Sequence, residues 1–194
     1  MDKESLPLIL KECTVILTDV CKERKSGAHI VQGNVDLTQS ISLPLPEKCG
    51  AKRCKTCPNF KEDNTFLSSF TGRSYGLVGS ALSCKTKNIV YLITCTTCRY
   101  QYVGETECSL RDRMNGHRSS IKTKKHTYMA QHFNIDGHKF EEASIHIIEK
   151  IDTDQTQAKQ FRLDRERFWM SELCTIYPYG LNDKVKGVGN VSNL

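Results

Sequence analysis

Two tyrosines and two cysteines stand almost symmetrically around one short segment of the sequence. Tyr91 and Cys95 precede residues 96–97, and Cys98 and Tyr102 follow them. Cross-strand partners in a hairpin point to the same side of the sheet. A hairpin closed at this segment would therefore offer two phenols to a site and two thiolates to a metal ion.

The hairpin itself is predicted from two short strands at residues 90–94 and 99–103, joined by a two-residue turn. This register places Tyr91 opposite Tyr102, and the two cysteines opposite each other. Taken alone, the two tyrosines are better explained as half-buried residues of an ordinary sheet.

The two cysteines at the turn have the spacing of a zinc knuckle. Cys95-x2-Cys98 can deliver two thiolates to zinc, which needs two further ligands. His132 and His138 are the candidates, and His126 competes as a partner for His132 because it lies at the same spacing. The alternative is that these histidines are surface residues near buried thiols.

A second group of cysteines lies upstream. Its members are Cys49, Cys54, Cys57 and Cys84, the last of them just before the first predicted strand. Four thiolates would close a structural zinc site. The alternative is a flexible cysteine-rich loop.

The composition favours metal ligands over disulfides. The chain has 194 residues and ten cysteines, but no secretory signal and no apolar stretch approaching the ~20 residues of a membrane helix. Cysteines outside the secretory pathway are usually reduced or bound to metal. We therefore expect the cytosol or nucleus as the compartment.

The net charge of +6 is concentrated in one segment. Between residues 109 and 125 one acid, Asp112, accompanies six basic residues: Arg111, Arg113, Arg118, Lys122, Lys124 and Lys125. This excess favours contact with the phosphates of a polyanion. A solvated helix face is the alternative explanation.

The chain divides into four parts by composition. Residues 1–48 are predicted to form an arm or linker, and residues 49–84 a cysteine-rich zinc-binding segment. Residues 85–186 carry regular structure, and residues 187–194 are a flexible tail. The predicted class is α+β, with a small antiparallel sheet of about three strands flanked by helices and with zinc-binding inserts.

Residue patterns locate the helices and the third strand. Residues 109–120 are predicted to form a helix with Ser109 as its N-cap, and residues 127–133 a shorter one. Residues 143–151 alternate in part like a strand, and residues 157–173 form the long helix.

Two helix faces carry groups that could do chemistry. Arg113 and His117 share one side of the first helix with Leu110, so two cationic groups are expected to point inward. On the long helix Glu166 lies in line with residues that should be buried, and a buried carboxylate needs a partner or a metal. An ion pair with Arg162 is the simplest explanation of Glu166 from spacing alone.

The order of these motifs resembles the GIY-YIG endonuclease family over about half of the chain. The paired signature falls on residues 89–91 and 102–104, where Ile89 and Val90 replace the family's first glycine and isoleucine. Residues 166–169 and 180–182 match later motifs of the family.

The resemblance implies hydrolysis of DNA phosphodiester bonds with Mg²⁺ or Mn²⁺. The implied site residues are Tyr91, Tyr102, Arg113, His117, Glu166 and Asn182. Glu166 would bind the divalent cation, and Arg113 would stabilise charge on the phosphate. A tyrosine with a lowered pKa, foremost Tyr91, would accept a proton from water, while Asn182 would complete the wall of the site.

The motifs are most similar to those of the endonuclease domain of Penelope-like retroelements, which also insert a Cys-x2-Cys, follow it with two histidines and carry upstream cysteines. That resemblance implies a nuclear nickase whose 3′-hydroxyl primes reverse transcription, with DNA as substrate. A reverse transcriptase domain or RNA template would be a partner if the chain is a fragment. Two alternatives stay open: a zinc-stabilised DNA-binding module without cleavage, inactive or retained by a host, and a structure-specific repair nuclease.

Overall fold

The computed structural model of the chain describes residues 45–77, 81–152 and 155–183. The predicted tail at residues 187–194, and all but the last four residues of the predicted arm, lie outside these ranges. Among the described residues no helix has the length and apolar character needed to cross a membrane.

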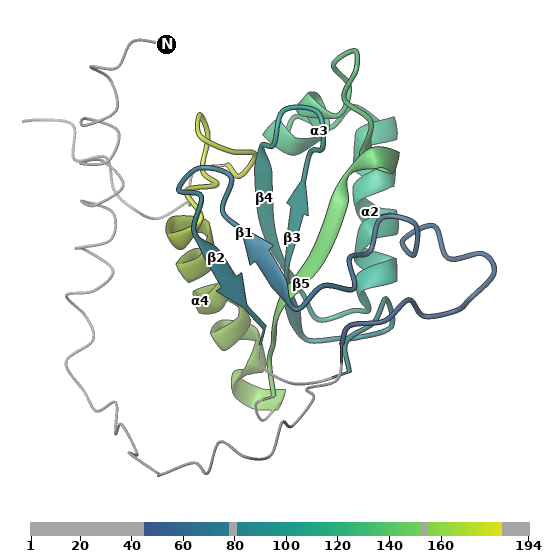
Figure 1. The fold of residues 1–194 in the computed structure, drawn as a ribbon, viewed down its shortest axis with the longest axis vertical. Coiled ribbons are helices and arrows are strands. Elements are labelled where there is room, and N and C mark those ends of the chain that lie inside the picture. Colours follow the sequence, from purple (N-terminus) through teal and green to yellow (C-terminus); the bar gives the residue numbers. More distant parts are fainter. Residues whose placement is uncertain (1–44, 78–80, 153–154, 184–194) are drawn as a thin grey trace, which may run out of the picture. The chain divides into compact units, whose positions relative to one another are not determined.

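An antiparallel three-stranded sheet forms the centre of the fold (Figure 1). Its order is β4 (Gln101–Thr106), β3 (Ile89–Thr94), β5 (Ser144–Lys150). All six residues of β3 are buried, because this strand has a neighbour on each side and helices on both faces. The predicted α+β class with about three antiparallel strands is confirmed.

Successive residues of β3 enter two separate apolar cores. Tyr91 packs toward α2 (Leu110–Lys122), together with the other odd-numbered residues of the strand. Val90 and Leu92 pack toward α4 (Gln155–Glu172). This alternation follows from the two-residue period of a strand, and it places α2 and α4 on opposite sides of the sheet (Figure 1).

The helices begin where their capping residues predict. The Ser109 side chain accepts a hydrogen bond from the Asp112 N–H at the start of α2. Thr127 caps α3 (Tyr128–His132) in the same way. Each cap satisfies a backbone donor that has no partner inside its helix, which is why sequence alone locates these ends.

The register of the hairpin differs from the prediction by two residues. Tyr91 pairs with Gly104, and Tyr102 pairs with Ile93. The turn is longer than two residues, since Arg99 adopts a left-handed conformation (φ 70°) and its N–H bonds the Cys95 carbonyl. A shift of two preserves the alternation of faces, so both tyrosines still lie on the same side of the sheet.

A two-stranded sheet lies within the cysteine-rich part of the chain, where no strand was predicted. It pairs β1 (Thr65–Leu67) with β2 (Ser74–Gly76). Phe66 of β1 packs into the core beneath α4, against Trp169. Strands of three residues are too short to show a period in the sequence.

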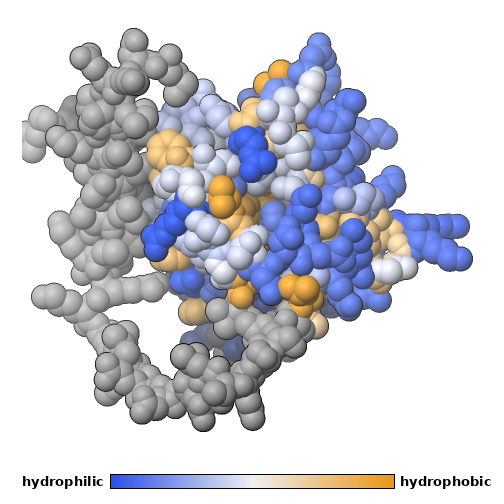
Figure 2. Space-filling view, in the orientation of Figure 1, coloured by the Kyte–Doolittle hydropathy of each residue, from blue (hydrophilic) through white to orange (hydrophobic). Residues whose placement is uncertain are grey.

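The face of the described part that Figure 2 shows is mainly polar. Figure 2 shows hydrophilic side chains over most of one face, with apolar residues in small separate groups. A short 3-10 helix, η1 (Phe140–Glu142), leads into β5 and buries Phe140 in the core on the α2 side. The chemistry is therefore found in specific polar clusters rather than in an extended apolar surface.

Candidate active site and metal centres

Tyr91 lies across Gly104 at the middle of the hairpin. Its side chain is fully buried, and a β-carbon at position 104 would overlap the Tyr91 hydroxyl and come within 2.8 Å of Tyr102 Cε1. Only glycine leaves this space open. Gly104 is therefore a functional position that sequence reasoning quoted within a motif but gave no role.

The Tyr91 hydroxyl joins two residues of α2. Arg113 Nε donates to it at 2.9 Å, and His117 Nε2 lies 2.6 Å away. Arg113 and His117 are one helical turn apart, which explains how a single phenol reaches both. The predicted inward direction is confirmed for His117, which is buried, whereas Arg113 reaches the same hydroxyl with its Nε but is exposed.

The charge states in this group differ from the predicted ones. Burial, followed by the charges of Arg113 and Arg118, lowers the pKa of His117 to about 3, so this imidazole is neutral near pH 7. Burial raises the pKa of Tyr91 well above its usual value, and the nearby Tyr102 adds to the shift. The prediction of a cationic His117 was therefore wrong, whereas a tyrosine pKa lowered beside a bound divalent cation stays a prediction.

Glu166 is held at the edge of the sheet by the backbone. Its Oε1 accepts a hydrogen bond from the Glu105 N–H at 3.1 Å. Burial, with the charge of Glu105, raises the pKa of the Glu166 carboxyl. The alternative of an ion pair with Arg162 is wrong, because Arg162 pairs with Glu105 at 2.8 Å and Glu107 at 3.2 Å.

Asn182 is bonded to the same edge strand. Its side-chain oxygen accepts from the Val103 N–H at 2.9 Å, and its Nδ2 donates to the Val103 carbonyl at 2.7 Å. The Leu181 N–H bonds the Gln101 carbonyl at 2.8 Å. Asn182 thus holds the strand that carries Tyr102, and this is how it contributes to the wall of the site.

Together these contacts supply hydrogen-bond partners for backbone groups of alternate residues along the outer edge of β4. Gln101 and Val103 bond to the segment after α4, and Glu105 bonds to Glu166 of that helix. The phenols lie on the α2 face of the sheet, and the carboxylate lies at its edge. The arrangement brings a cation, a neutral imidazole, two phenols and a carboxylate to the middle part of the hairpin, where they suit binding and hydrolysis of a phosphate ester.

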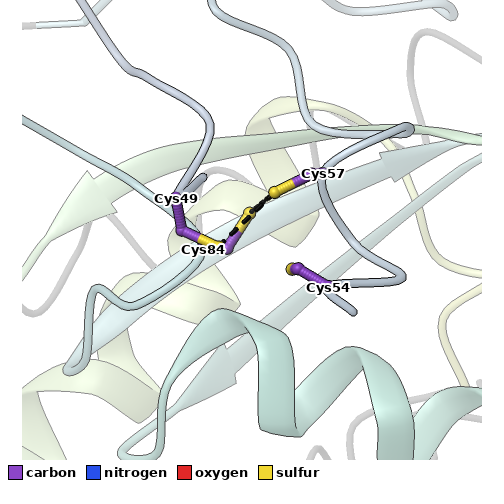
Figure 3. A group of neighbouring side chains, drawn as sticks. All are labelled: Cys49, Cys54, Cys57 and Cys84. Atoms are coloured by element: carbon purple, nitrogen blue, oxygen red, sulfur yellow. Dashed lines mark hydrogen bonds between the residues drawn. The ribbon is translucent and has the colours of Figure 1, made fainter. Parts of the chain in front are cut away.

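The upstream cysteines converge on one point (Figure 3). The sulfur atoms of Cys49, Cys54, Cys57 and Cys84 lie within 4.8 Å of one another. The Cys49–Cys57 distance is 3.4 Å and the Cys57–Cys84 distance is 3.7 Å. Tetrahedral zinc with Zn–S bonds of about 2.3 Å separates its sulfurs by about 3.8 Å, so the group has nearly the size of a zinc site.

The environments of these thiols differ. A backbone hydrogen bond at Ala51 is the main cause that lowers the pKa of Cys49 to about 7. Burial raises the pKa of Cys84. A bound cation would favour the thiolate form of both groups, and four thiolates would leave it no open position.

The hairpin tip forms the second cluster. Cys95 Sγ lies 3.4 Å from His138 Nδ1, and Cys98 Sγ lies 3.5 Å from His132 Nε2. Sulfur and nitrogen ligands of tetrahedral zinc are separated by about 3.6 Å. His126 is exposed and lies outside this group, so the competing ligand set is not the one that the fold assembles.

The basic segment divides into two parts. Arg118 turns to the Lys55 carbonyl and to the Phe140 ring, and so joins α2 to the cysteine-rich segment. Arg111 lies beside Asp112 at 3.9 Å. The exposed cations of the segment are Arg113, whose Nε bonds Tyr91, and Lys122, Lys124 and Lys125.

A family model and a solved structure each match part of the chain. Residues 87–176 match the family model of the GIY-YIG catalytic domain. Among solved structures, the chain is similar to the catalytic domain of homing endonuclease I-TevI, with 23% identity over 48% of this chain and 94% of that chain and a TM-score of 0.39. No curated protein gave a significant match. Residues 87–176 are thus similar in sequence to a GIY-YIG catalytic domain.

Proposed function

We propose that this domain nicks DNA, hydrolysing one phosphodiester bond at a time and leaving a 3′-hydroxyl end. The observation that carries the proposal is the Tyr91 hydroxyl, which Arg113 and a neutral His117 hold at the edge strand that also anchors Glu166. A single set of these groups serves one phosphate at a time. Cutting of the second strand would require a second binding event.

Arg113 is suited to bind the phosphate. Its Nε–H is fixed on Tyr91, and the residue is exposed, so the guanidinium can reach the phosphate oxygens. A guanidinium aimed at the developing negative charge lowers the energy of the transition state more than that of the bound substrate.

Tyr91 and His117 form a route for the proton of the attacking water. Because the pKa of Tyr91 is raised, the phenol does not act as a preformed phenolate. It can accept a proton from water while its own proton passes to the neutral His117 Nε2, 2.6 Å away. The low pKa of His117 makes that imidazole a weak base, so the proton would leave it again readily.

Glu166 would hold the divalent cation. Mg²⁺ and Mn²⁺ prefer oxygen ligands and usually bind through one or two carboxylates together with substrate phosphates. One oxygen of Glu166 is fixed by the Glu105 N–H, so the carboxylate has a defined orientation. When bound, the ion would supply Lewis-acid stabilisation of the charge on the phosphate.

The two cysteine clusters would hold zinc in a structural role. Each offers four ligand atoms, and a site with four protein ligands has no position for substrate. Zinc at the hairpin tip would fix the turn to α3, at the end of the strand that carries Tyr102.

We further propose that the nick primes reverse transcription in a retroelement setting, in the nucleus. The support is the order of motifs in the sequence: upstream cysteines, a Cys-x2-Cys between the two signature halves, and two histidines after them. A reverse transcriptase domain and an RNA template would then be partners of this chain.

A plasmid assay tests the proposal. With Mg²⁺, the protein should convert supercoiled plasmid to open circles before any linear product, and a DNA polymerase should extend the new 3′ ends. Glu166→Gln keeps an acceptor for the Glu105 N–H but removes the charge, so nicking should fall about 100-fold or more. Folded wild-type protein that cuts neither plasmid nor branched DNA would refute nuclease activity, and linear product without open circles would refute nicking.

A further inference from the structure

Three tyrosines near the active site leave much of their rings in solvent. Tyr100, Tyr128 and Tyr177 are 43%, 36% and 46% exposed. They come from the β3–β4 turn, from α3 and from the segment after α4, and we call them the aromatic row. Large exposed rings on otherwise polar surfaces often mark binding sites.

The three rings are ordered along α3. Tyr177 stacks on Tyr128 with ring centroids 4.0 Å apart and planes within 1°. Tyr100 stacks on His132, with centroids 6.0 Å apart and planes at 20°. Tyr128 and His132 are four residues apart in α3 and therefore lie on the same side of it. The rings consequently follow one side of this helix from the hairpin tip to the segment after α4.

Both ends of the aromatic row are fastened to the strand of the active site. Tyr100 is two residues from Tyr102 along the chain, and its carbonyl accepts from the Cys95 N–H. The Tyr177 N–H bonds the Asn182 carbonyl, and the Asn182 side chain bonds Val103. Figure 1 shows α3, the β3–β4 turn and the segment after α4 at the same end of the sheet.

Exposed cations belong to the same segments as the rings. Lys124 and Lys125 precede α3, and Arg99 precedes Tyr100. Cations that follow a phosphate backbone, combined with aromatic faces that bases can stack on, are the features of surfaces that bind single-stranded nucleic acid. Bases in an intact duplex are already stacked and cannot use such rings.

We propose that the aromatic row binds an unpaired DNA strand next to the bond that is cut, with bases stacked on Tyr100, Tyr128 and Tyr177 and phosphates near Lys124 and Lys125. The position of this strand relative to the cut rests on the proposed nuclease function; the binding itself does not. The domain would accordingly prefer DNA that is opened on one side of the cleavage site.

Binding of fluorescein-labelled DNA to the full chain without added Mg²⁺ tests this proposal. One probe is a blunt duplex, and the other is the same duplex with a short single-stranded extension that contains 2-aminopurine. Wild-type protein should bind the extended probe about tenfold more tightly and quench its 2-aminopurine. The double variant Tyr128→Leu/Tyr177→Leu should lose this preference and the quenching, but keep its affinity for the blunt duplex.

Phe161→Leu is the matched control, because Phe161 is an equally exposed aromatic residue (43%) outside the aromatic row. It should behave as wild type, and Tyr177→Trp should keep the preference. Equal binding of the two probes by wild-type protein would overturn the proposal. So would a double variant, shown by its melting curve to be folded, that retains the preference. Because neither result depends on cleavage, failure of the plasmid assay would be a separate outcome.

Discussion

The active-site edge and the cysteine clusters are built in opposite ways. At the edge of β4, long side chains from several elements are positioned by hydrogen bonds to backbone and to each other, as with Tyr91 between Arg113 and His117. In the clusters, cysteines and histidines from loops and from α3 converge on one point in each cluster. The first arrangement needs an ordered fold around it, whereas the second would supply order through a bound ion.

Under the proposed function, catalysis and stability would depend on different residues of this chain. Residues 49–60 contain no regular helix or strand, so a metal would replace the apolar core that such a short segment cannot form. The active-site residues instead rest on a sheet whose central strand is buried on both faces. Changes in the two regions should therefore have distinguishable effects.

The largest effect is expected on stability when a cluster loses a buried ligand. Cys84 is fully buried, and Cys84→Ser should remove one of about two bound zinc ions and destabilise the protein by about 4 kcal/mol or more, since loss of a structural metal is among the most costly changes. Zinc analysis and thermal melting measure this result. Cys108→Ser is the control, because Cys108 is exposed and outside both clusters. Unchanged zinc content in Cys84→Ser would show that Cys84 is not needed to bind zinc, and would contradict the metal-based stability of this region.

The next effect is expected on activity. In Gly104→Ala the added methyl group must displace Tyr91 from Arg113 and His117, so nicking should fall about 100-fold, with about 1–3 kcal/mol of destabilisation from overpacking. Plasmid nicking and thermal melting at fixed zinc content separate these two effects. Gly116→Ala is the matched control, since nothing lies within 4 Å of a β-carbon there and alanine favours the helix. Wild-type activity in Gly104→Ala would show that the position of Tyr91 is not critical.

The smallest effect is expected on the pH dependence of the free energy of unfolding, through His146, which lies outside both regions. Burial, opposed by Asp63 and reinforced by Lys61, lowers the pKa of His146 to about 4. A lowered histidine pKa gives stability that is present above the unfolded value of about 6.5 and is lost as the pH falls toward 4. Wild-type protein should therefore lose up to about 1.4 kcal/mol per pH unit relative to His146→Gln in this range.

Denaturant titrations of both proteins at several pH values measure that difference. The comparison with a variant cancels the acid lability of the metal ligands, which the two proteins share. A constant difference in unfolding free energy between pH 7 and pH 4 would mean that burial does not keep His146 neutral.

Local features of the fold could be predicted from sequence because their causes are local. Ser109 and Thr127 accept hydrogen bonds within their own helical turns, so the capping residue itself marks each start. The hairpin register could not be predicted, since it depends on the left-handed Arg99 and on a tip closed between cysteines and distant histidines.

Site membership was more predictable than site chemistry. Spacing on α2 was enough to place Arg113 and His117 on one side, and the structure brings both to Tyr91. The neutral state of His117 depends on how deeply the fold buries it, and no spacing encodes that depth. Likewise, Arg162 forms its ion pair with Glu105 rather than with Glu166 because α4 packs against β4, and the spacing of residues in the sequence does not show that packing.

The outer edge of β4 has a consequence for association between molecules. An unpaired strand edge is a template on which another chain can add a strand, and proteins usually block it with charge, proline or a covering segment. Here the blocking groups are Asn182 and Glu166, which accept the N–H groups of Val103 and Glu105. Residues proposed for the cleavage site would thus also protect the molecule from self-association, and a variant that lacks these side chains risks dimers and aggregates along with lost activity.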